Sequence, residues 1–396
     1  MELNKQKYLI ITKDAMCTDY LPPYGNSEHY TPNISELADK GTIFRNHYTA
    51  APSTVMAFYS MITGKYAHET NYELFEKFHD KYDDATIFSK LKQQGFECHF
   101  LWDSINSVFN DYFDLFRDDV KVHVFPTFRQ GVGAHYKHEG FLEDDPIAES
   151  KTFKIVRDIV SEITSASERL FLWIHFPHVI NGRTGYGSDI ELFDKYIGLL
   201  RQFFDDDCIV ISADHGNMNG HKGKLCYGFD AYQPNARIPL ITPRINGIKE
   251  ILNNTSNVDL YSIICGKVPE RDFVYTDTAY RGQFHRILAI YYKNYKLVYH
   301  KNSDKTELFD LATDPTEEFS LYNDYYFDSS RNAYTPAREL YYYSNWSALP
   351  EIRKVLLEEK DRIWRNGNSK NERKNRIRKL LIPFKTFLLN FKEAMR

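Results

Sequence analysis

Four residues from distant parts of the chain have the side chains needed to bind a divalent cation and attack an ester. Asp14, Asp214 and His215 offer oxygen and nitrogen ligands of the kinds that Zn²⁺, Mn²⁺ and Mg²⁺ accept. Thr54 offers a hydroxyl at the start of an apolar run that ends at Gly64. A hydroxyl bound to a divalent cation loses its proton more easily, and the alkoxide can attack phosphorus or sulfur. These residue types therefore indicate metal-assisted attack by Thr54.

Thr54 stands where the chain is predicted to enter a helix. The first amides of a helix lack intrahelical acceptors and lie at the positive end of the dipole, so this position favours an anion. An ordinary N-cap role is the alternative for Thr54. Ser53 would serve that role equally well, so capping alone does not choose between the two residues.

Three further residues are candidates for supporting roles. His178 and His221 could complete a second metal site or contact the leaving oxygen. Lys224, in a Gly-His-Lys-Gly-Lys segment, could bind a phosphate oxygen. Each of the three could equally be a loop residue without a role. His175 could be a strand residue that is satisfied in the core.

Three short apolar runs lead to residues of this set. They have no polar alternation, which is typical of strands buried on both faces, and they span residues 8–12, 170–174 and 208–213. Asp14 follows the first run, His175 the second and Asp214 the third. Ligands of open α/β sheets bind outside the carboxyl ends of the strands, so the three ends predict one shared site.

Segments with apolar residues at helical spacing lie between these runs, at residues 84–94, 148–167 and 188–204. The pattern predicts an α/β fold with one large, mostly parallel sheet between helices. Residues 287–292 and 295–299 are predicted to pair as a hairpin about Lys293 and Asn294. We therefore expect a small C-terminal antiparallel subdomain, followed by a helical tail.

Two parts are expected along the chain. Residues 1–318 are predicted to form a catalytic domain, with an antiparallel edge at about 285–318. Residues 319–396 are predicted to hold a Tyr-rich segment of little periodicity and then a basic helical tail.

The tail from Asn366 to Arg396 contains nine Lys or Arg against two Glu, a local charge of about +7, together with bulky apolar residues. This composition favours a surface helix on an anionic membrane. A solvated or partner-packed terminal helix is the alternative, because Pro383 interrupts any long helix.

The whole chain has a formal net charge of -4, which gives no global case for binding nucleic acid or membranes. Its five cysteines are scattered without CxxC spacing, which argues against a disulfide framework or a cysteine zinc site. The first apolar run is too short for a signal peptide. We expect a cytoplasmic protein, with contact at the inner membrane face through the tail if the membrane interpretation holds.

In their order and spacing these residues resemble the sulfatase and alkaline-phosphatase-like superfamily, over most of residues 6–318. The segments that carry the resemblance are Asp14 with Tyr24-Gly25, Thr31-Pro-Asn33, Leu37-Ala38, Gly41, Phe44-Arg-Asn46, Thr63-Gly64, His175-Phe-Pro-His178, Asp214-His-Gly216, Arg237-Ile-Pro-Leu240 and Glu307 through Pro315. The resemblance implies that Thr54 is the nucleophile. It also implies that Asp14, Thr54, Asp214 and His215 bind a divalent metal (Zn, Mn, Mg or Ca), with His221 as a further candidate ligand.

Four departures from the sulfatase pattern bear on the chemistry. Thr54 holds the place of the Cys or Ser that sulfatases convert to formylglycine, and Phe58 stands where their Arg belongs. Ala15 replaces the second carboxylate of a metal-binding pair. The second sulfatase signature, which begins at Gly95, lacks its lysine and ends in Trp102-Asp103. Thr nucleophiles are usual in the phospho branches of the superfamily.

The resemblance therefore implies a metal-dependent phosphoester transferase with a phosphothreonyl intermediate and with Thr54, His178 and Lys224 in catalysis. Its partners would be a phospholipid head-group donor, of the phosphoethanolamine or phosphoglycerol type, and a glycan or glycolipid acceptor; nucleic acid is not expected. A soluble phosphodiesterase or phosphomonoesterase is the first alternative. A non-catalytic binding protein is the second, and sulfate ester hydrolysis is a more distant one.

Overall fold

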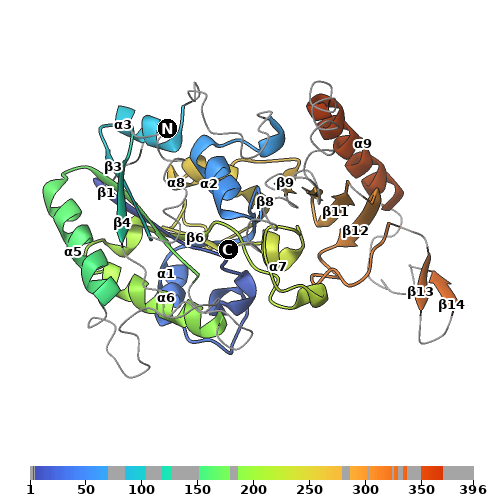
Figure 1. The fold of residues 1–396 in the computed structure, drawn as a ribbon, viewed down its shortest axis with the longest axis horizontal. Coiled ribbons are helices and arrows are strands. Elements are labelled where there is room, and N and C mark those ends of the chain that lie inside the picture. The colour runs from blue at the N-terminus through green and yellow to red at the C-terminus, as the bar shows by residue number, and fades with distance from the viewer. Residues whose placement is uncertain are drawn as a thin grey trace, which may run out of the picture.

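The computed structural model describes residues 3, 5–69, 85–103, 118–125, 151–178, 186–278, 286–301, 303–322, 325–328, 333–336 and 349–368. Its centre is an eight-stranded sheet in the order β4-β3-β5-β1-β6-β7-β2-β8 (Figure 1). The strands are β1 (Lys7–Lys13), β2 (Thr42–Tyr48), β3 (Glu97–Asp103), β4 (Lys121–Phe125), β5 (Leu170–Phe176), β6 (Ile209–Ala213), β7 (Leu240–Thr242) and β8 (Glu250–Ser256). Only β7 runs antiparallel to its neighbours, so the predicted mostly parallel sheet is confirmed.

The three predicted buried strands, β5, β1 and β6, are neighbours at the centre of the sheet. In their registers Lys13 pairs with Phe176 on one side and with Ala213 on the other. The carboxyl ends of the three strands are therefore level. As a result, the residues that follow β1 and β6, Asp14 and Asp214, emerge beside each other.

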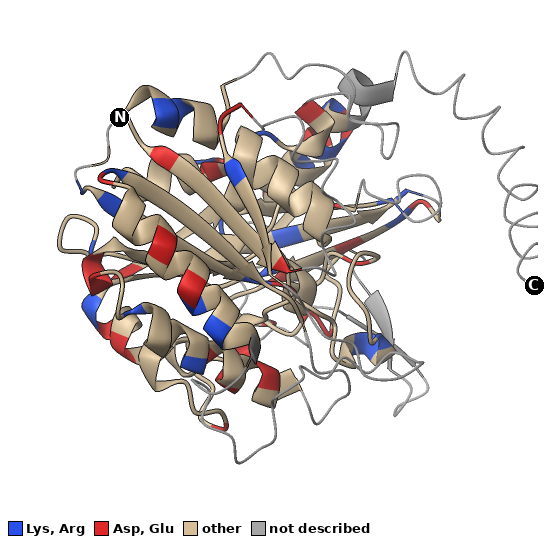
Figure 2. Ribbon diagram, turned by 60° about the vertical axis from the view of Figure 1, so that its left-hand side comes forward, with Lys and Arg blue, Asp and Glu red and all other residues tan. Residues whose placement is uncertain are grey.

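Helices cover both faces of the sheet (Figure 1). One face packs against α2 (Thr54–Thr63), α3 (Ile87–Gln93) and α8 (Leu260–Ile264), and the other against α1 (Pro32–Lys40), α5 (Lys151–Ala166) and α6 (Tyr186–Leu200). Within β1, Ile10 belongs to the first core while Leu9 and Ile11 belong to the second, which explains the missing polar alternation. Acidic and basic residues are interspersed on the covering helices (Figure 2).

A second sheet is antiparallel and has the order β12-β11-β10-β9. Its strands are β9 (Val274–Asp277), β10 (Ile287–Tyr292), β11 (Tyr295–His300) and β12 (Lys305–Asp310). The predicted hairpin is confirmed as β10 and β11, and Lys293 in its turn has a left-handed φ of 55°. The subdomain starts earlier than residue 285, and it forms its own sheet instead of extending an edge of the large one.

The helix α9 (Leu349–Asn368) lies across this second sheet (Figure 1). Leu349, Ile352 and Leu356 share a core with Leu288 and Leu297 of β10 and β11. The short pair β13 (Tyr325–Asp328) and β14 (Ala333–Pro336) was not predicted from the Tyr-rich segment. Most of the basic tail, residues 369–396, lies outside the described residues. Among the residues that are described, no helix is both long enough and apolar enough to cross a bilayer.

Candidate metal and nucleophile site

Asp14, Asp214 and His215 converge at the carboxyl end of the central strands. Each offers one ligand atom, and these three atoms all lie within 4.8 Å of one another. All three side chains are buried. The structure thus brings together three of the predicted metal ligands from the ends of β1 and β6.

The two carboxylate oxygens of Asp214 have different surroundings. Oδ1 accepts hydrogen bonds from the backbone amides of His215, at 2.7 Å, and of Ala15, at 3.1 Å. Oδ2 is buried without a hydrogen-bond partner. The backbone therefore fixes the carboxylate through one oxygen and leaves the other for a ligand. Ala15, whose φ of 58° is left-handed, contributes through its backbone.

The tautomer of His215 follows from its surroundings. Its Nδ1 lies 2.8 Å from the Gly216 carbonyl oxygen, which can only accept, so Nδ1 carries the hydrogen and the neutral ring has a bare Nε2. This Nε2 lies 3.5 Å from Asp14 Oδ1 and 3.4 Å from Asp214 Oδ2. Asp14 Oδ1 and Asp214 Oδ2 are buried without a hydrogen-bond partner beside this Nε2. A divalent cation shared by the three atoms would satisfy them.

Gly216 is required by close packing. A Cβ at this position would lie 1.9 Å from the carbonyl oxygen of Pro234. The glycine therefore lets the chain pass close to Pro234 directly after His215, because no side chain fits there.

Thr54 is the first residue of α2, and Ser53 occupies the N-cap position. The Thr54 hydroxyl oxygen lies 3.2 Å from Nε2 of His215, and the side chain is 8 % exposed. Ser53 makes no capping hydrogen bond from its side chain. Thr54 therefore faces the Asp14, Asp214 and His215 group instead of capping the helix.

Burial dominates the electrostatics of this group. It raises the pKa of Asp14, and the neighbouring Asp214 carboxylate raises this pKa further, while His215 and His175 oppose the change. Burial also lowers the pKa of His175 to about 3, so this ring is neutral near pH 7. Nε2 of His175 has no hydrogen-bond partner and lies 3.9 Å from Asp214 Oδ2. His175 thus borders the site, a position that its sequence pattern left open.

His178 is held by two buried residues that the sequence did not indicate. Its Nδ1 lies 2.7 Å from Asp189 Oδ2, and Lys13 Nζ lies 2.5 Å from the same oxygen. Lys13 also donates to the Pro177 carbonyl oxygen at 3.1 Å. Burial opposes ionisation of Asp189, but Lys13 and His178 outweigh it and lower its pKa. A lysine at the end of β1, directly before Asp14, was the one available signal of this arrangement.

His221 and Lys224 lie outside the three-residue group. The His221 ring is 6.2 Å, centroid to centroid, from the ring of Tyr232. The Lys224 ammonium pairs with Asp230 and lies 5.4 Å from the Tyr232 ring centroid. The structure therefore gives both predicted residues other neighbours than the site.

Phe58, which stands where the sulfatase pattern has Arg, forms an aromatic wall behind the site. It is buried and packs against Trp173, at a centroid distance of 5.4 Å, and against Phe100 at 5.6 Å. Its ring also meets the edge of His175 at 4.7 Å. A guanidinium at this position would be enclosed by aromatic rings.

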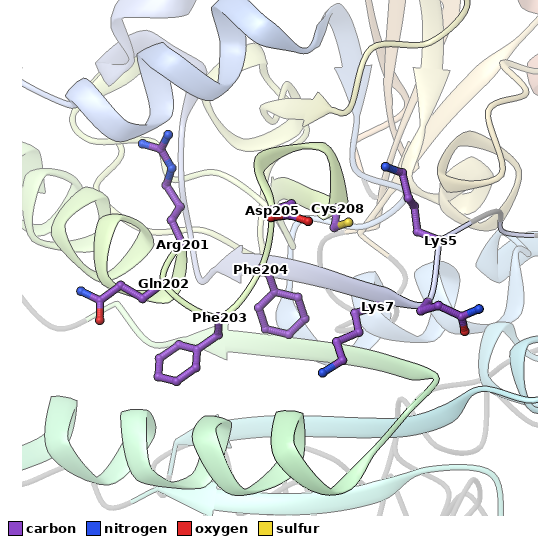
Figure 3. Close-up of a pocket in the computed structure, with 9 residues that line it drawn as sticks. Lys5, Lys7, Arg201, Gln202, Phe203, Phe204, Asp205 and Cys208 are labelled. Carbon is purple, nitrogen blue, oxygen red and sulfur yellow. The ribbon is translucent and has the colours of Figure 1, made fainter.

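A basic cavity of about 340 Å³ lies at the opposite, amino end of β1 (Figure 3). Lys5, Lys7 and Arg201 line it. Lys5 pairs with Asp207 and Arg201 with Asp206, so these two charges are already matched. The seven residues of β1 separate it from Asp14 by about 20 Å. The cavity is therefore distinct from the candidate site.

Solved structures with the same fold include a 2-O GAG sulfatase, BT1596, with a TM-score of 0.70 at 15 % identity. That match covers 94 % of this chain and 94 % of the other. A phosphonate monoester hydrolase of Agrobacterium radiobacter matches with a TM-score of 0.59 at 14 % identity, over 92 % of this chain and 96 % of the other. At these identities the likeness establishes the fold.

Sequence relatives match over shorter stretches. A phosphopentomutase of Agathobacter rectalis is 47 % identical over 53 residues, or 13 % of this chain and 12 % of that protein. A choline-sulfatase of Rhizobium meliloti is 26 % identical over 175 residues, or 36 % of this chain and 34 % of that protein. The matched stretches thus span 34 % or less of these two relatives.

Residues 6–266 match the model of the sulfatase family. This range contains Asp14, Thr54, Asp214 and His215, and it agrees with the resemblance seen in the sequence. The chain belongs to the sulfatase family and has the α/β fold of its enzymes.

Proposed function

We propose that this protein is a metal-dependent phosphoester enzyme whose nucleophile is Thr54. The observation that carries the proposal is the 3.2 Å contact between the Thr54 hydroxyl oxygen and Nε2 of His215, within a group of unpartnered buried acceptors. The start of α2 adds unpaired backbone amides around the same hydroxyl, which favours an anionic phosphate.

The donor set suits a hard or borderline divalent cation. Asp14, Asp214 and His215, together with the Thr54 hydroxyl, would hold it, and Asp14 Oδ1 and Asp214 Oδ2 have no other partner. When bound, such a cation supplies Lewis acidity for phosphoester cleavage.

The protein's own residues would act in two steps. Thr54 Oγ1 gives its proton to solvent water and forms a bond to phosphorus while the bond from phosphorus to the leaving oxygen breaks; His178 donates a proton to that oxygen. Water or an acceptor alcohol then gives its proton to His178 and attacks the phosphothreonyl group, and Thr54 Oγ1 leaves phosphorus and takes a proton back from solvent water. Asp189 and Lys13 hold the His178 ring for both transfers.

Two features favour phosphorus over sulfur. A threonine cannot yield the formylglycine aldehyde that sulfatases use, and Phe58 replaces their arginine with an aromatic wall. Among the named relatives, a phosphopentomutase and a phosphonate monoester hydrolase have phosphorus chemistry in their names. Sulfate ester hydrolysis is the second candidate, favoured by the family match and by the choline-sulfatase relative.

The acceptor separates a hydrolase from a transferase. Water as the acceptor gives a phosphodiesterase or phosphomonoesterase. A glycan or glycolipid hydroxyl gives the head-group transferase that the sequence resemblance implies. Product analysis with and without added alcohols distinguishes the two. Only a transferase joins the added alcohol to the phosphoryl group, and it then forms less of the product that water would give.

The direct test is peptide mass spectrometry of the protein after incubation with phosphodiesters, phosphomonoesters and choline sulfate, each with Zn²⁺, Mn²⁺, Mg²⁺ or Ca²⁺. We expect a phosphorus adduct on Thr54, its absence in Thr54→Ala, and its retention in Thr54→Ser. Phosphoester turnover by Thr54→Ala at the normal rate would overturn the proposal. Turnover of choline sulfate alone would select the second candidate.

A further inference from the structure

The segment 221–229 exposes three large apolar side chains beside the candidate site. Leu225 is 57 % exposed, Tyr227 37 % and Phe229 38 %. The Tyr227 ring lies 4.4 Å, centroid to centroid, from the ring of His215. The segment is therefore in direct contact with the metal and nucleophile group.

The same segment also passes the turn that leads into α2. Gly228 has a left-handed φ of 87°, and a Cβ added to it would lie 3.7 Å from the Pro52 carbonyl oxygen. Tyr227 and Gly228 thus touch both sides of the site, His215 and the turn before Thr54. Leu225 and Phe229 follow two residues away on either side.

Exposing these side chains has a free-energy cost that a bound ligand would offset. Burial of large apolar side chains against a ligand removes apolar surface from water, which favours binding. Clusters of exposed apolar residues on soluble proteins mark binding surfaces more often than single ones do. Leu252, by contrast, is 65 % exposed on the edge strand β8 of the large sheet, far along the sheet from β6.

Positive charge accompanies the apolar residues through Lys222. This residue belongs to the same segment, is exposed and donates to a neutral acceptor, the Glu317 carbonyl oxygen. The charge of Lys224 is matched by Asp230. A ligand with an anionic head and an apolar chain matches this composition, because the head would face Thr54 and the chain would face Leu225 and Phe229.

We infer that Leu225, Tyr227 and Phe229 form a subsite for the alkyl or acyl part of an amphiphilic phosphoester. The inference rests on the proposed function, since it assigns the apolar part of that substrate. The chain could come from a dispersed amphiphile or from a lipid in a bilayer, and both sources share this chemistry.

The first experiment compares p-nitrophenyl alkyl phosphodiesters from methyl to octyl, all below the concentrations at which they form micelles. Full burial of one methylene is worth about 0.8 kcal/mol, or about fourfold, so a half-exposed subsite should raise kcat/KM about twofold per methylene. The Leu225→Ser/Phe229→Ser double variant should abolish this dependence, so that its kcat/KM is the same for the methyl and octyl esters. Leu252→Ser is the matched control and should keep the wild-type slope.

A second readout does not depend on turnover. Methyl to octyl phosphonates are titrated calorimetrically into the same proteins, with and without added divalent metal. If longer chains bind more tightly to the wild type and this trend is lost in the double variant, the subsite is supported. If at the same time no phosphoester is turned over, only the proposed function is rejected. Turnover and binding that are both independent of chain length would overturn the subsite and leave the proposed function standing.

Vesicles of phosphatidylglycerol distinguish the two sources of the chain. Flotation of wild type, but not of the double variant, with these vesicles would identify a bilayer lipid. Chain-length dependence for dispersed ligands without flotation would identify a free amphiphile.

Discussion

The hydroxyl oxygen of Thr54 lies 3.2 Å from Nε2 of His215, although 161 residues separate the two along the chain. Thr54 is placed by the first turn of α2, and His215 by the end of β6 and by its contact with the Gly216 carbonyl oxygen. Backbone elements hold both partners, so the contact is a property of the fold. Substitutions of single side chains can therefore test the chemistry without moving the site.

Metal content should depend on the two carboxylates. Asp214→Asn removes the unpartnered Oδ2, so we expect divalent metal affinity to fall by more than about 10-fold, and Asp14→Asn should act similarly. Inductively coupled plasma mass spectrometry after dialysis against Zn²⁺ or Mn²⁺ gives the stoichiometry. Asp206→Asn, at the opposite end of the sheet, is the control that should retain metal. Equal metal in all four proteins would contradict the assignment of the ligands.

The buried pair of Lys13 and Asp189 should be costly to break on one side only. Asp189→Asn leaves the Lys13 ammonium buried without its anion, so unfolding free energy should fall by about 3–5 kcal/mol. Lys13→Met/Asp189→Leu should recover a large part of this loss, because neither charge then remains. Urea denaturation measures both. Lys40→Met breaks only surface ion pairs, so it should change the unfolding free energy far less than Asp189→Asn does.

A double variant as unstable as Asp189→Asn would show that the pair stabilises through more than charge matching. The same double variant should still lose phosphoester turnover, because His178 then lacks the oxygen that orients its ring.

Stability in acid should depend on Glu307 of β12. Burial opposes its ionisation, but hydrogen bonds from His300, Tyr232 and Lys305 lower its pKa from 4.5 to about 2. Because the folded pKa lies below the unfolded one, the ionised carboxylate stabilises the fold above about pH 4.5, and this contribution is lost as the pH falls toward 2. Glu307→Gln should therefore be less stable near neutral pH and lose less stability between about pH 5 and pH 3. Parallel pH curves for the two proteins, from urea denaturation, would refute this.

Arginine at position 58 should not be tolerated. Phe58→Arg places a charge among Trp173, Phe100 and His175, so it should destabilise the protein by at least about 2 kcal/mol more than Phe58→Leu, which only loses packing. Thermal unfolding compares the two. An arginine variant as stable as wild type would mean that the guanidinium reaches an anion at the site, as the sulfatase pattern requires.

The sequence predicted the central strands and the meeting of Asp14 with Asp214 because both follow simple rules. Strands buried on both faces are continuous apolar runs, and parallel strands end at one edge, so Asp14 and Asp214 could be expected to meet. Thr54 could be placed because the chain enters a helix there. These features depend on local pattern and on one topological rule.

The placement of Asp189 and Lys13 around His178 could not be predicted, because it depends on which residue of α6 faces the end of β1. Asp189 belongs to an amphipathic helix pattern in which an acidic residue is normally solvated, yet here it is buried. His221 and Lys224 were expected at the site because of their residue types. The path of their segment is set by left-handed Gly220 and Gly223, a geometry that residue types alone do not give.

The match to the family model stops at residue 266, but the apolar surfaces of β10, β11 and β12 are covered by α9, which begins at Leu349. An expression fragment trimmed to the matched residues would lose the second sheet, and one trimmed just after β12 would leave Leu288, Leu297 and Leu308 facing water. Such fragments should precipitate or recruit chaperones. Crystallisation and enzymology of shortened versions should therefore keep the polypeptide at least through Ile363.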